Sequence, residues 1–197
     1  MKDFKWEKVF KPLIDYHKPR SFCEIGCHEG LTLKNLFPYI KDKFNYKLHY
    51  IGFDAFDLAI RPDFKHPINP ITGDYEHNGK ESASYDKILE RCVKFKAAGY
   101  LEDYELIKGW THDTLKGPLK YDMVYIDGGH SFNTVKWDYE QVKSSKVIIF
   151  DDTYEIKFPG VAEFIKELKT KKIPVKEIIH KNEKGKVLMQ CAYIENE

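Results

Sequence analysis

The chain has 197 residues, the length of one domain of ordinary size, and 42% of them are hydrophobic, enough for one sizeable core. Lys and Arg number 32 and Asp and Glu number 31, so the formal net charge is +1; this disfavours nucleic acid or any other partner that is bound through bulk charge. The four cysteines are scattered and indicate neither a disulfide framework nor a zinc site.

The N-terminal segment predicts a helix rather than a leader. Trp6, Val9, Phe10 and Leu13 recur at helical spacing, and Pro19 follows the end of the pattern. Charged residues alternate with apolar ones here, unlike the continuous apolar core of a signal peptide. No stretch of the sequence reaches the roughly 20 apolar residues of a membrane span. We therefore expect a cytoplasmic protein with no membrane partner.

Short apolar runs alternate with helical patterns through the middle of the chain. Five runs predict buried strands, and they lie at residues 21–26, 48–54, 104–109, 121–127 and 146–152. Apolar residues at helical spacing lie between or after these runs, at residues 33–40, 85–92, 132–142 and 161–168. Strands that alternate with helices predict a mostly parallel sheet covered by helices on both faces.

The C-terminal part predicts a hairpin. Residues 174–181 and 186–195 read as strands that flank the turn-forming residues 182–185. Such a hairpin places an antiparallel strand at or near the edge of the sheet. The expected fold is therefore α/β: one Rossmann-like, doubly wound, seven-stranded and mostly parallel sheet with an antiparallel C-terminal strand, in a single domain covering residues 1–197.

An insertion interrupts this alternation at about residues 55–100. Its first part, residues 61–82, is rich in Pro, Gly, Asn and His and predicts a long loop, which the helical pattern at residues 85–92 then follows. Long loops in compact domains are often lids or binding segments, and a mobile surface insertion is the alternative that the sequence leaves open.

The turn after the first strand is the first candidate binding site. Gly26 and Gly30 permit a tight turn, and the start of the following helix offers unpaired N–H groups to an anion. The spacing does not match the dinucleotide fingerprint of three glycines, which disfavours pyrophosphate binding. Asp54 closes the second strand, where a carboxylate can accept hydrogen bonds from both ribose hydroxyls. The alternative for Asp54 is an ordinary surface acid.

Three acids and a histidine form the second candidate site. Asp127, Asp151 and Asp152 end two successive strands, which open onto the same edge of a doubly wound sheet. Their mutual repulsion favours a divalent cation with oxygen ligands, Mg²⁺ foremost, although each acid alone could cap a turn or helix. His130 can accept a hydroxyl proton near neutral pH, or it simply precedes a helix capped by Ser131.

Taken together, these motifs resemble those of class I S-adenosylmethionine-dependent methyltransferases. The matching residues are 24–30, 54, 109–115, 125–130 and 150–152. More narrowly, the chain resembles metal-dependent small-molecule O-methyltransferases of the catechol, caffeoyl-CoA and macrocin kinds, over roughly residues 21–168. The resemblance implies S-adenosylmethionine as cofactor, with Mg²⁺ as a second one.

The resemblance also implies a role for each site residue. The cofactor-binding residues would be Glu24, Gly26, Gly30, Thr32, Asp54, Trp110, Thr111 and His112. Among these, the glycine turn would line the methionine part of the cofactor, and Thr32 would bind the carboxylate of that part. Asp54 would bind the ribose, and the residues 110–112 would contact the adenine. The metal ligands would be Asp127, Asp151 and Asp152, and the catalytic residues His130, as base, and Asp127.

The function expected from the sequence is Mg²⁺-assisted methylation of a hydroxyl on a small molecule, such as a sugar or natural product. One alternative is a nucleotide- or sugar-nucleotide-binding Rossmann module without methyl transfer. Another is a methyltransferase acting on a macromolecule, for which the lysine-rich residues 166–172 and 181–186 could be cited, although such runs are more often solvated faces. We expect no nucleic-acid partner, and the sequence leaves a homo-oligomer open.

Overall fold

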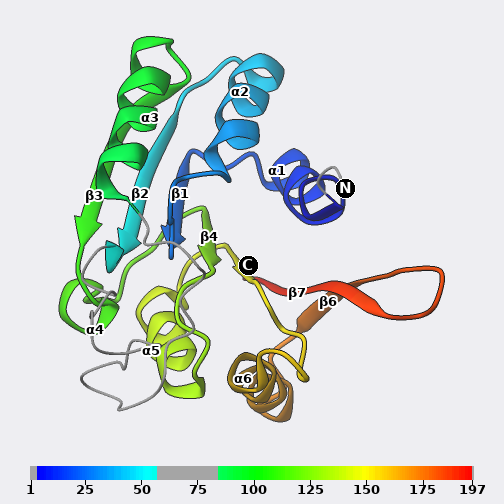
Figure 1. The fold of residues 1–197 in the computed structure, drawn as a ribbon. Helices are drawn as coiled ribbons and strands as arrows, with labels where there is room; N and C mark the ends of the chain where they lie inside the picture. Colours follow the sequence, from blue (N-terminus) through cyan, green and yellow to red (C-terminus); the bar gives the residue numbers. More distant parts are fainter. Residues whose placement is uncertain (1–3, 57–83, 197) are drawn as a thin grey trace.

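A seven-stranded sheet forms the centre of the computed structural model, which describes residues 4–56 and 84–196 (Figure 1). The strand order is β3-β2-β1-β4-β5-β7-β6. The strands are β1 Ser21–Ile25, β2 Leu48–Asp54, β3 Leu101–Lys108, β4 Met123–Ile126, β5 Val147–Phe150, β6 Val175–Lys181 and β7 Val187–Glu195. The first five strands pair in parallel, and β7 runs antiparallel to both β5 and β6. The expected fold class is confirmed, with the antiparallel C-terminal strand one position inside the edge.

Helices cover both faces of this sheet. Their bounds are η1 Trp6–Phe10, α1 Lys11–His17, α2 Leu33–Phe44, α3 Tyr85–Ala97, α4 Thr111–Thr114, α5 Phe132–Val142 and α6 Pro159–Thr170. One apolar core joins η1, α1, α2 and α3 to the sheet, and a second core joins α5 and α6 to the opposite face. Neighbouring residues of β4 and β5 enter different cores because successive strand side chains point to opposite faces.

Local signals mark where several elements end. The N-terminal helical run stops at His17 because Lys18 takes a left-handed conformation at φ 48°, close to the expected end. The predicted hairpin is confirmed as β6 and β7, which project away from the body of the protein (Figure 1). In its turn, the Asn182 side chain accepts hydrogen bonds from the amides of Lys184 and Lys186, and Gly185 supplies the positive φ.

The insertion predicted at about residues 55–100 is only partly described. Its helix is confirmed as α3, which buries Ile88 and Cys92 and is capped by the Ser84 side chain. The loop predicted before it lies largely in residues 57–83, outside the described residues. None of the helices in the described ranges is long and apolar enough to cross a membrane.

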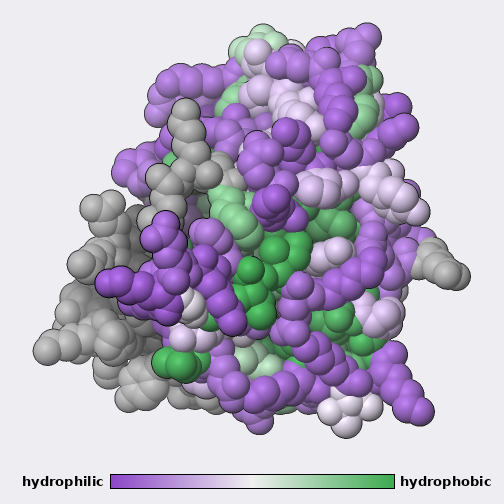
Figure 2. Space-filling view, turned by 90° about the vertical axis from the view of Figure 1, so that its right-hand side faces the viewer, coloured by the Kyte–Doolittle hydropathy of each residue, from purple (hydrophilic) through white to green (hydrophobic). Residues whose placement is uncertain are grey.

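The side of the protein that carries the N-terminal helix and the hairpin is mostly hydrophilic, with an apolar area in its middle (Figure 2). On the hairpin, Ile179 is 46% exposed and Leu188 is 44% exposed. These side chains lie on β6 and β7, so part of the hairpin surface remains apolar.

The contact between α5 and α6 leaves no room for a side chain at Gly160. A Cβ atom there would lie 2.5 Å from the carbonyl oxygen of His130 and 2.5 Å from the amide nitrogen of Phe132. Both of these atoms are backbone atoms, which cannot rotate away. The first turn of α6 therefore packs directly on the segment that carries His130.

We predict that Gly160→Ala will destabilise the protein by about 1–3 kcal/mol, the usual cost of forcing an added methyl group into a close-packed contact. Urea unfolding of the two proteins measures the difference. Gly99→Ala is the matched control, because a Cβ at Gly99 meets nothing within 4 Å and only the strain of a positive φ is added. A Gly160→Ala protein as stable as the wild type would show that the α5–α6 contact is not tight.

Candidate active site

The carboxyl ends of the five parallel strands form one row. Hydrogen bonds between neighbouring strands continue one residue past the strand ends, with N···O distances of 2.8 to 3.0 Å. The amides that donate these bonds belong to Gly109, Gly26, Asp127 and Asp151. The motifs that the sequence placed at separate strand ends are thus brought side by side, as expected for a parallel sheet.

The glycine turn lies directly against the carboxylate side of this row. Gly26 has φ 84°, and a Cβ atom at this position would lie 2.3 Å from the carbonyl oxygen of Asp127. Only glycine satisfies both the backbone conformation and this approach. Gly30 also has a positive φ, 68°, and packs against the Ile88 side chain of α3. The turn predicted to bind the cofactor therefore lies directly beside the backbone of Asp127, a residue of the predicted carboxylate site.

Asp54 connects the end of β2 to this turn. One carboxylate oxygen accepts the amide of His28 at 2.7 Å, and the other accepts the amide of Phe56 at 2.6 Å. Burial raises the pKa of Asp54, against the effect of these two hydrogen bonds. A carboxylate has about four lone-pair sites, so Asp54 keeps acceptor capacity for a ligand hydroxyl.

Glu24 is buried beneath the turn, with 1% of its surface exposed. The Tyr50 hydroxyl donates to its carboxylate at 2.8 Å, and the Thr32 hydroxyl is a second hydrogen-bond partner. Burial raises the pKa of Glu24 to about 7, although both hydroxyls act in the opposite direction. Thr32, predicted to bind the cofactor carboxylate, thus has its hydroxyl engaged by Glu24.

The residues predicted to contact an adenine lie at the start of α4, after β3. Trp110 is half-buried and immediately precedes the helix. The carbonyl of Thr111 accepts the indole N–H of Trp137 at 3.2 Å, and the His112 ring stacks on the same indole with centroids 5.1 Å apart. Burial lowers the pKa of His112, so a neutral ring is favoured. Trp137, on α5, therefore orients this part of the site.

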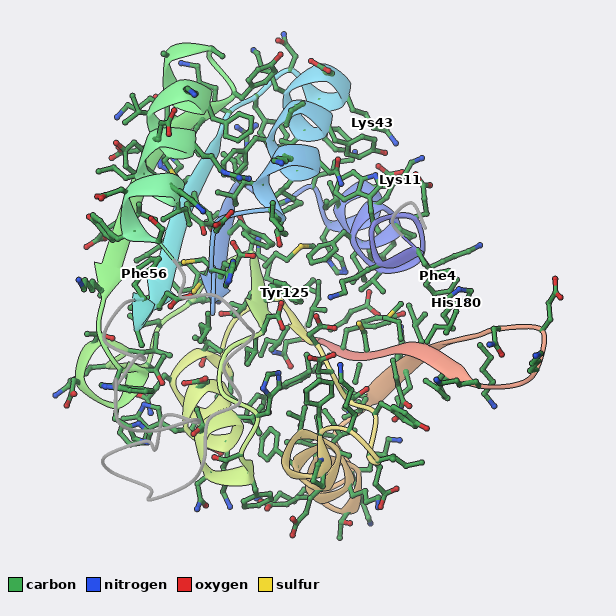
Figure 3. All side chains as sticks on the ribbon, in the orientation of Figure 1. Phe4, Lys11, Lys43, Phe56, Tyr125 and His180 are labelled. Atoms are coloured by element: carbon green, nitrogen blue, oxygen red, sulfur yellow. The ribbon has the colours of Figure 1, made fainter. Side chains whose placement is uncertain are left out.

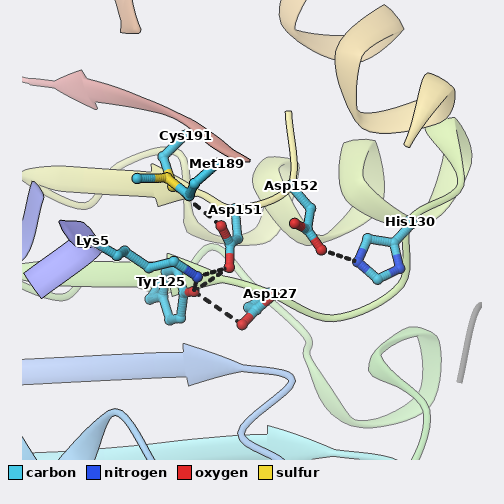
Figure 4. Close-up of polar contacts among 8 residues, drawn as sticks. All are labelled: Lys5, Tyr125, Asp127, His130, Asp151, Asp152, Met189 and Cys191. Atoms are coloured by element: carbon cyan, nitrogen blue, oxygen red, sulfur yellow. Dashed lines mark hydrogen bonds and ion pairs between the residues drawn. The ribbon is translucent and has the colours of Figure 1, made fainter. Parts of the chain in front are cut away.

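Three of the predicted catalytic and metal-binding residues converge (Figure 4). One potential ligand atom from each of Asp127, His130 and Asp152 lies within 4.8 Å of the other two. The His130 Nε2 atom is 3.2 Å from Asp152 Oδ2, and the ring stacks on Phe158 at 4.4 Å. Two carboxylates that face one position are a donor set that suits a hard divalent cation, so these residues fit the metal that the resemblance implies.

Asp151, the third predicted metal ligand, faces a different set of partners. Its carboxylate is 5% exposed and forms an ion pair with Lys5 of the N-terminal helical segment. The Tyr125 hydroxyl lies 2.6 Å from the same carboxylate oxygen, and the Cys191 thiol donates to the other oxygen at 3.1 Å. Burial alone would raise the pKa of Asp151, but the ammonium of Lys5 and the hydrogen bonds from Tyr125 and Cys191 together outweigh it, and the pKa is lowered.

The pKa of Asp127 moves in the opposite direction. Burial raises it well above its usual range, and the negative charge of Asp151 adds to the rise. The Tyr125 hydroxyl connects the two acids, since it also lies 3.0 Å from Asp127 Oδ2. A cation beside Asp127 would favour its ionised form, which is the form that binds metal.

The sequence prediction missed Lys5 and Tyr125. A hydroxyl inside the otherwise apolar strand β4, two residues before Asp127, was a usable signal for Tyr125. Lys5 gave no such signal, because the chain has 32 basic residues and nothing local separates this one from the rest.

Glu24→Gln should change the pH dependence of stability. Between the ordinary glutamate pKa of 4.5 and about 7, the unfolded chain loses this proton while the folded protein keeps it. The free energy of unfolding therefore falls as pH rises through that window, by about 3 kcal/mol for this group. Urea unfolding without cofactor at pH 5 and pH 8 should show this fall in the wild type and a smaller one in Glu24→Gln. Glu163→Gln, on the exposed side of α6, is the control.

An unchanged pH dependence in Glu24→Gln would mean that Glu24 does not retain its proton in the folded protein.

Comparison with known proteins agrees with this arrangement. A family model described as "Methyltransferase domain" matches residues 23–153. No curated protein sequence matches the chain. Among solved structures, the O-methyltransferase NovP superposes with a TM-score of 0.67 at 15% identity, covering 98% of this chain and 79% of NovP.

Two further similar structures carry the cofactor or its product. The Bacillus cereus O-methyltransferase in complex with SAH gives a TM-score of 0.60 at 13% identity, covering 100% of this chain and 83% of that one. TomG of Streptomyces achromogenes, an O-methyltransferase in complex with SAM, gives 0.59 at 14% identity, covering 100% and 82%. At these identities the structural likeness shows the fold, while the family match covers most of the chain. The protein therefore belongs to the methyltransferase domain family and has the fold of class I S-adenosylmethionine-dependent methyltransferases.

Proposed function

We propose that this protein transfers the methyl group of S-adenosylmethionine to a hydroxyl of a small molecule, assisted by Mg²⁺. One observation carries the proposal: the glycine turn touches Asp127, so a cofactor held by the turn lies beside the Asp127, His130 and Asp152 group. A nucleotide-binding module without transfer chemistry would not require a histidine and two acids at this place, and it does not agree with the family match.

In this proposal the turn residues hold the cofactor through complementary chemistry. The backbone at Gly26 approaches the methionine part closely, because no side chain intervenes. The remaining acceptor sites of Asp54 receive the ribose hydroxyls. The residues at the start of α4, namely Trp110, Thr111 and His112, contact the adenine ring. Glu24, oriented by Thr32, lies beneath the methionine end.

The catalytic residues then act on the acceptor hydroxyl. Asp127 and Asp152 are the oxygen ligands that would hold Mg²⁺, and the ion would supply a Lewis acid that lowers the pKa of a bound hydroxyl. His130 accepts the hydroxyl proton on an imidazole nitrogen, and Asp152 and the Phe158 ring hold its orientation. Methyl transfer is then a direct displacement, for which these residues fix the position of the oxygen.

One feature argues against nucleic acid as the acceptor. The lysine-rich stretch 166–172 is largely committed to ion pairs within the protein. These pairs are Lys166 with Glu155, Lys169 with Glu177 and Lys171 with Glu167. Such neutralised lysines do not form a free basic surface for nucleic acid.

Thermal melting with S-adenosylhomocysteine should raise the Tm of the wild type. A ligand at about 100 times its Kd contributes roughly 2.7 kcal/mol, which is several degrees for a chain of this size. NAD at the same concentration should give no shift, and Asp54→Ala should lose most of the S-adenosylhomocysteine shift. A shift with NAD instead would contradict the proposed cofactor. Mg²⁺ should raise the Tm further, and EDTA should reverse that rise.

His130→Ala should lower turnover about 100-fold or more, the range that a positioned base supplies, while the Tm shift with S-adenosylhomocysteine persists. Turnover is measured as transfer of labelled methyl to a panel of catechols, phenolic acids and sugars. His49→Ala is the control, because His49 lies exposed on β2. Full activity in His130→Ala would remove His130 as the base, and a loss of Mg²⁺ affinity in that variant would make it a ligand instead.

A further inference from the structure

We infer that Lys5 serves as a built-in cation of the carboxylate site: it holds Asp151 as a positioning group, so that a divalent cation binds through Asp127 and Asp152 without Asp151. The inference rests on the proposed function and deepens it. Three acids at matching strand ends suggested three equivalent ligands, whereas the structure separates one of them from the other two.

The contacts of Asp151 leave it little capacity for a metal. One oxygen receives the ammonium of Lys5 and the Tyr125 hydroxyl, and the other receives the Cys191 thiol (Figure 4). Three of the roughly four lone-pair sites of Asp151 are therefore occupied, and with only 5% of its side chain exposed it offers a metal little access. Asp127 and Asp152, by contrast, are only partly buried and face the same position.

Neighbouring residues fix the direction of the Lys5 side chain. The preceding residue, Phe4, stacks on His180 of β6, with ring centroids 4.0 Å apart (Figure 3). Five residues after Lys5, Phe10 packs edge-on against the Tyr125 ring, with ring centroids 5.0 Å apart. The Lys5 ammonium donates to the hydroxyl of that tyrosine at 2.9 Å. The segment is therefore anchored on both sides of the lysine.

The charges at the site agree with this arrangement. Three carboxylates and the one ammonium of Lys5 leave a net charge of −2, which one divalent cation neutralises. Without Lys5 the same ion would leave a buried negative charge unpaired, which is costly in a protein interior. Lys5 thus completes the charge balance from a part of the chain that carries none of the methyltransferase motifs.

Mn²⁺ binding to the full chain, measured from the electron paramagnetic resonance signal of free Mn²⁺, tests this inference. The variants are Lys5→Met, Asp151→Asn, the double variant with both changes, and Asp152→Asn. The double variant removes one positive and one negative charge and should bind Mn²⁺ within about threefold of the wild type. Asp152→Asn should lose tenfold or more, and Lys5→Met alone should bind more tightly. Lys8→Met, an exposed lysine of η1, should match the wild type.

A tenfold loss of Mn²⁺ affinity in the double variant would make Asp151 a ligand and overturn the inference, while leaving the proposed function intact. Absence of Mn²⁺ binding by the wild type would instead refute the metal in the proposed function. Urea unfolding in EDTA provides a second measurement. The double variant should lose less stability than the two single variants lose together, because the pair is removed as a unit. Additive losses would show that Lys5 does not hold Asp151 in solution.

Discussion

The parallel pairing of β1 with β2 on one side and β4 on the other is the constraint on which the rest of the site depends. In a parallel sheet every strand ends on the same edge, and the residue after each end leaves the sheet beside its neighbours. The match of Ile25 with Phe53 and with Ile126 sets Gly26 directly against Asp127. A shift of one residue in this register would turn the buried side chains of β1 to the opposite face and separate the two halves of the site.

Burial of charge is the second determinant of the site. The charge of an acid that is removed from water must be compensated, and the buried acids of this site are compensated in different ways. Glu24 is partly neutralised by a raised pKa, Asp54 accepts two backbone amides, and Asp151 is paired with Lys5. Asp127 has a raised pKa even though the positive charge of Lys5 acts to lower it, so a further positive charge beside it would favour its ionised form.

The N-terminal segment and the C-terminal hairpin both contact the carboxylate at the end of β5, through Lys5 and Cys191. The stacking of Phe4 on His180 connects elements from the two ends of the chain (Figure 3), and the packing of Phe10 on Tyr125 attaches the N-terminal segment to β4. These contacts hold the segment in which Lys5 lies, and Lys5 pairs with Asp151. Cys191 of β7 also donates a hydrogen bond to Asp151, so residues from both ends of the chain contact this carboxylate.

The sequence by itself determined the elements, their alternation and the residues at each strand end, because hydrophobic period and turn chemistry are local properties. It therefore gave the sheet, the hairpin and the candidate positions Gly26, Asp54 and Asp127. Only the tertiary structure decided that Asp151 pairs with Lys5 and Cys191 while Asp127 and Asp152 lie together with His130. Lys5 and Asp151 are 146 positions apart in the sequence, and Cys191 belongs to another strand. No local pattern relates such residues, because their contact depends on how the N-terminal helix and β7 pack around β5.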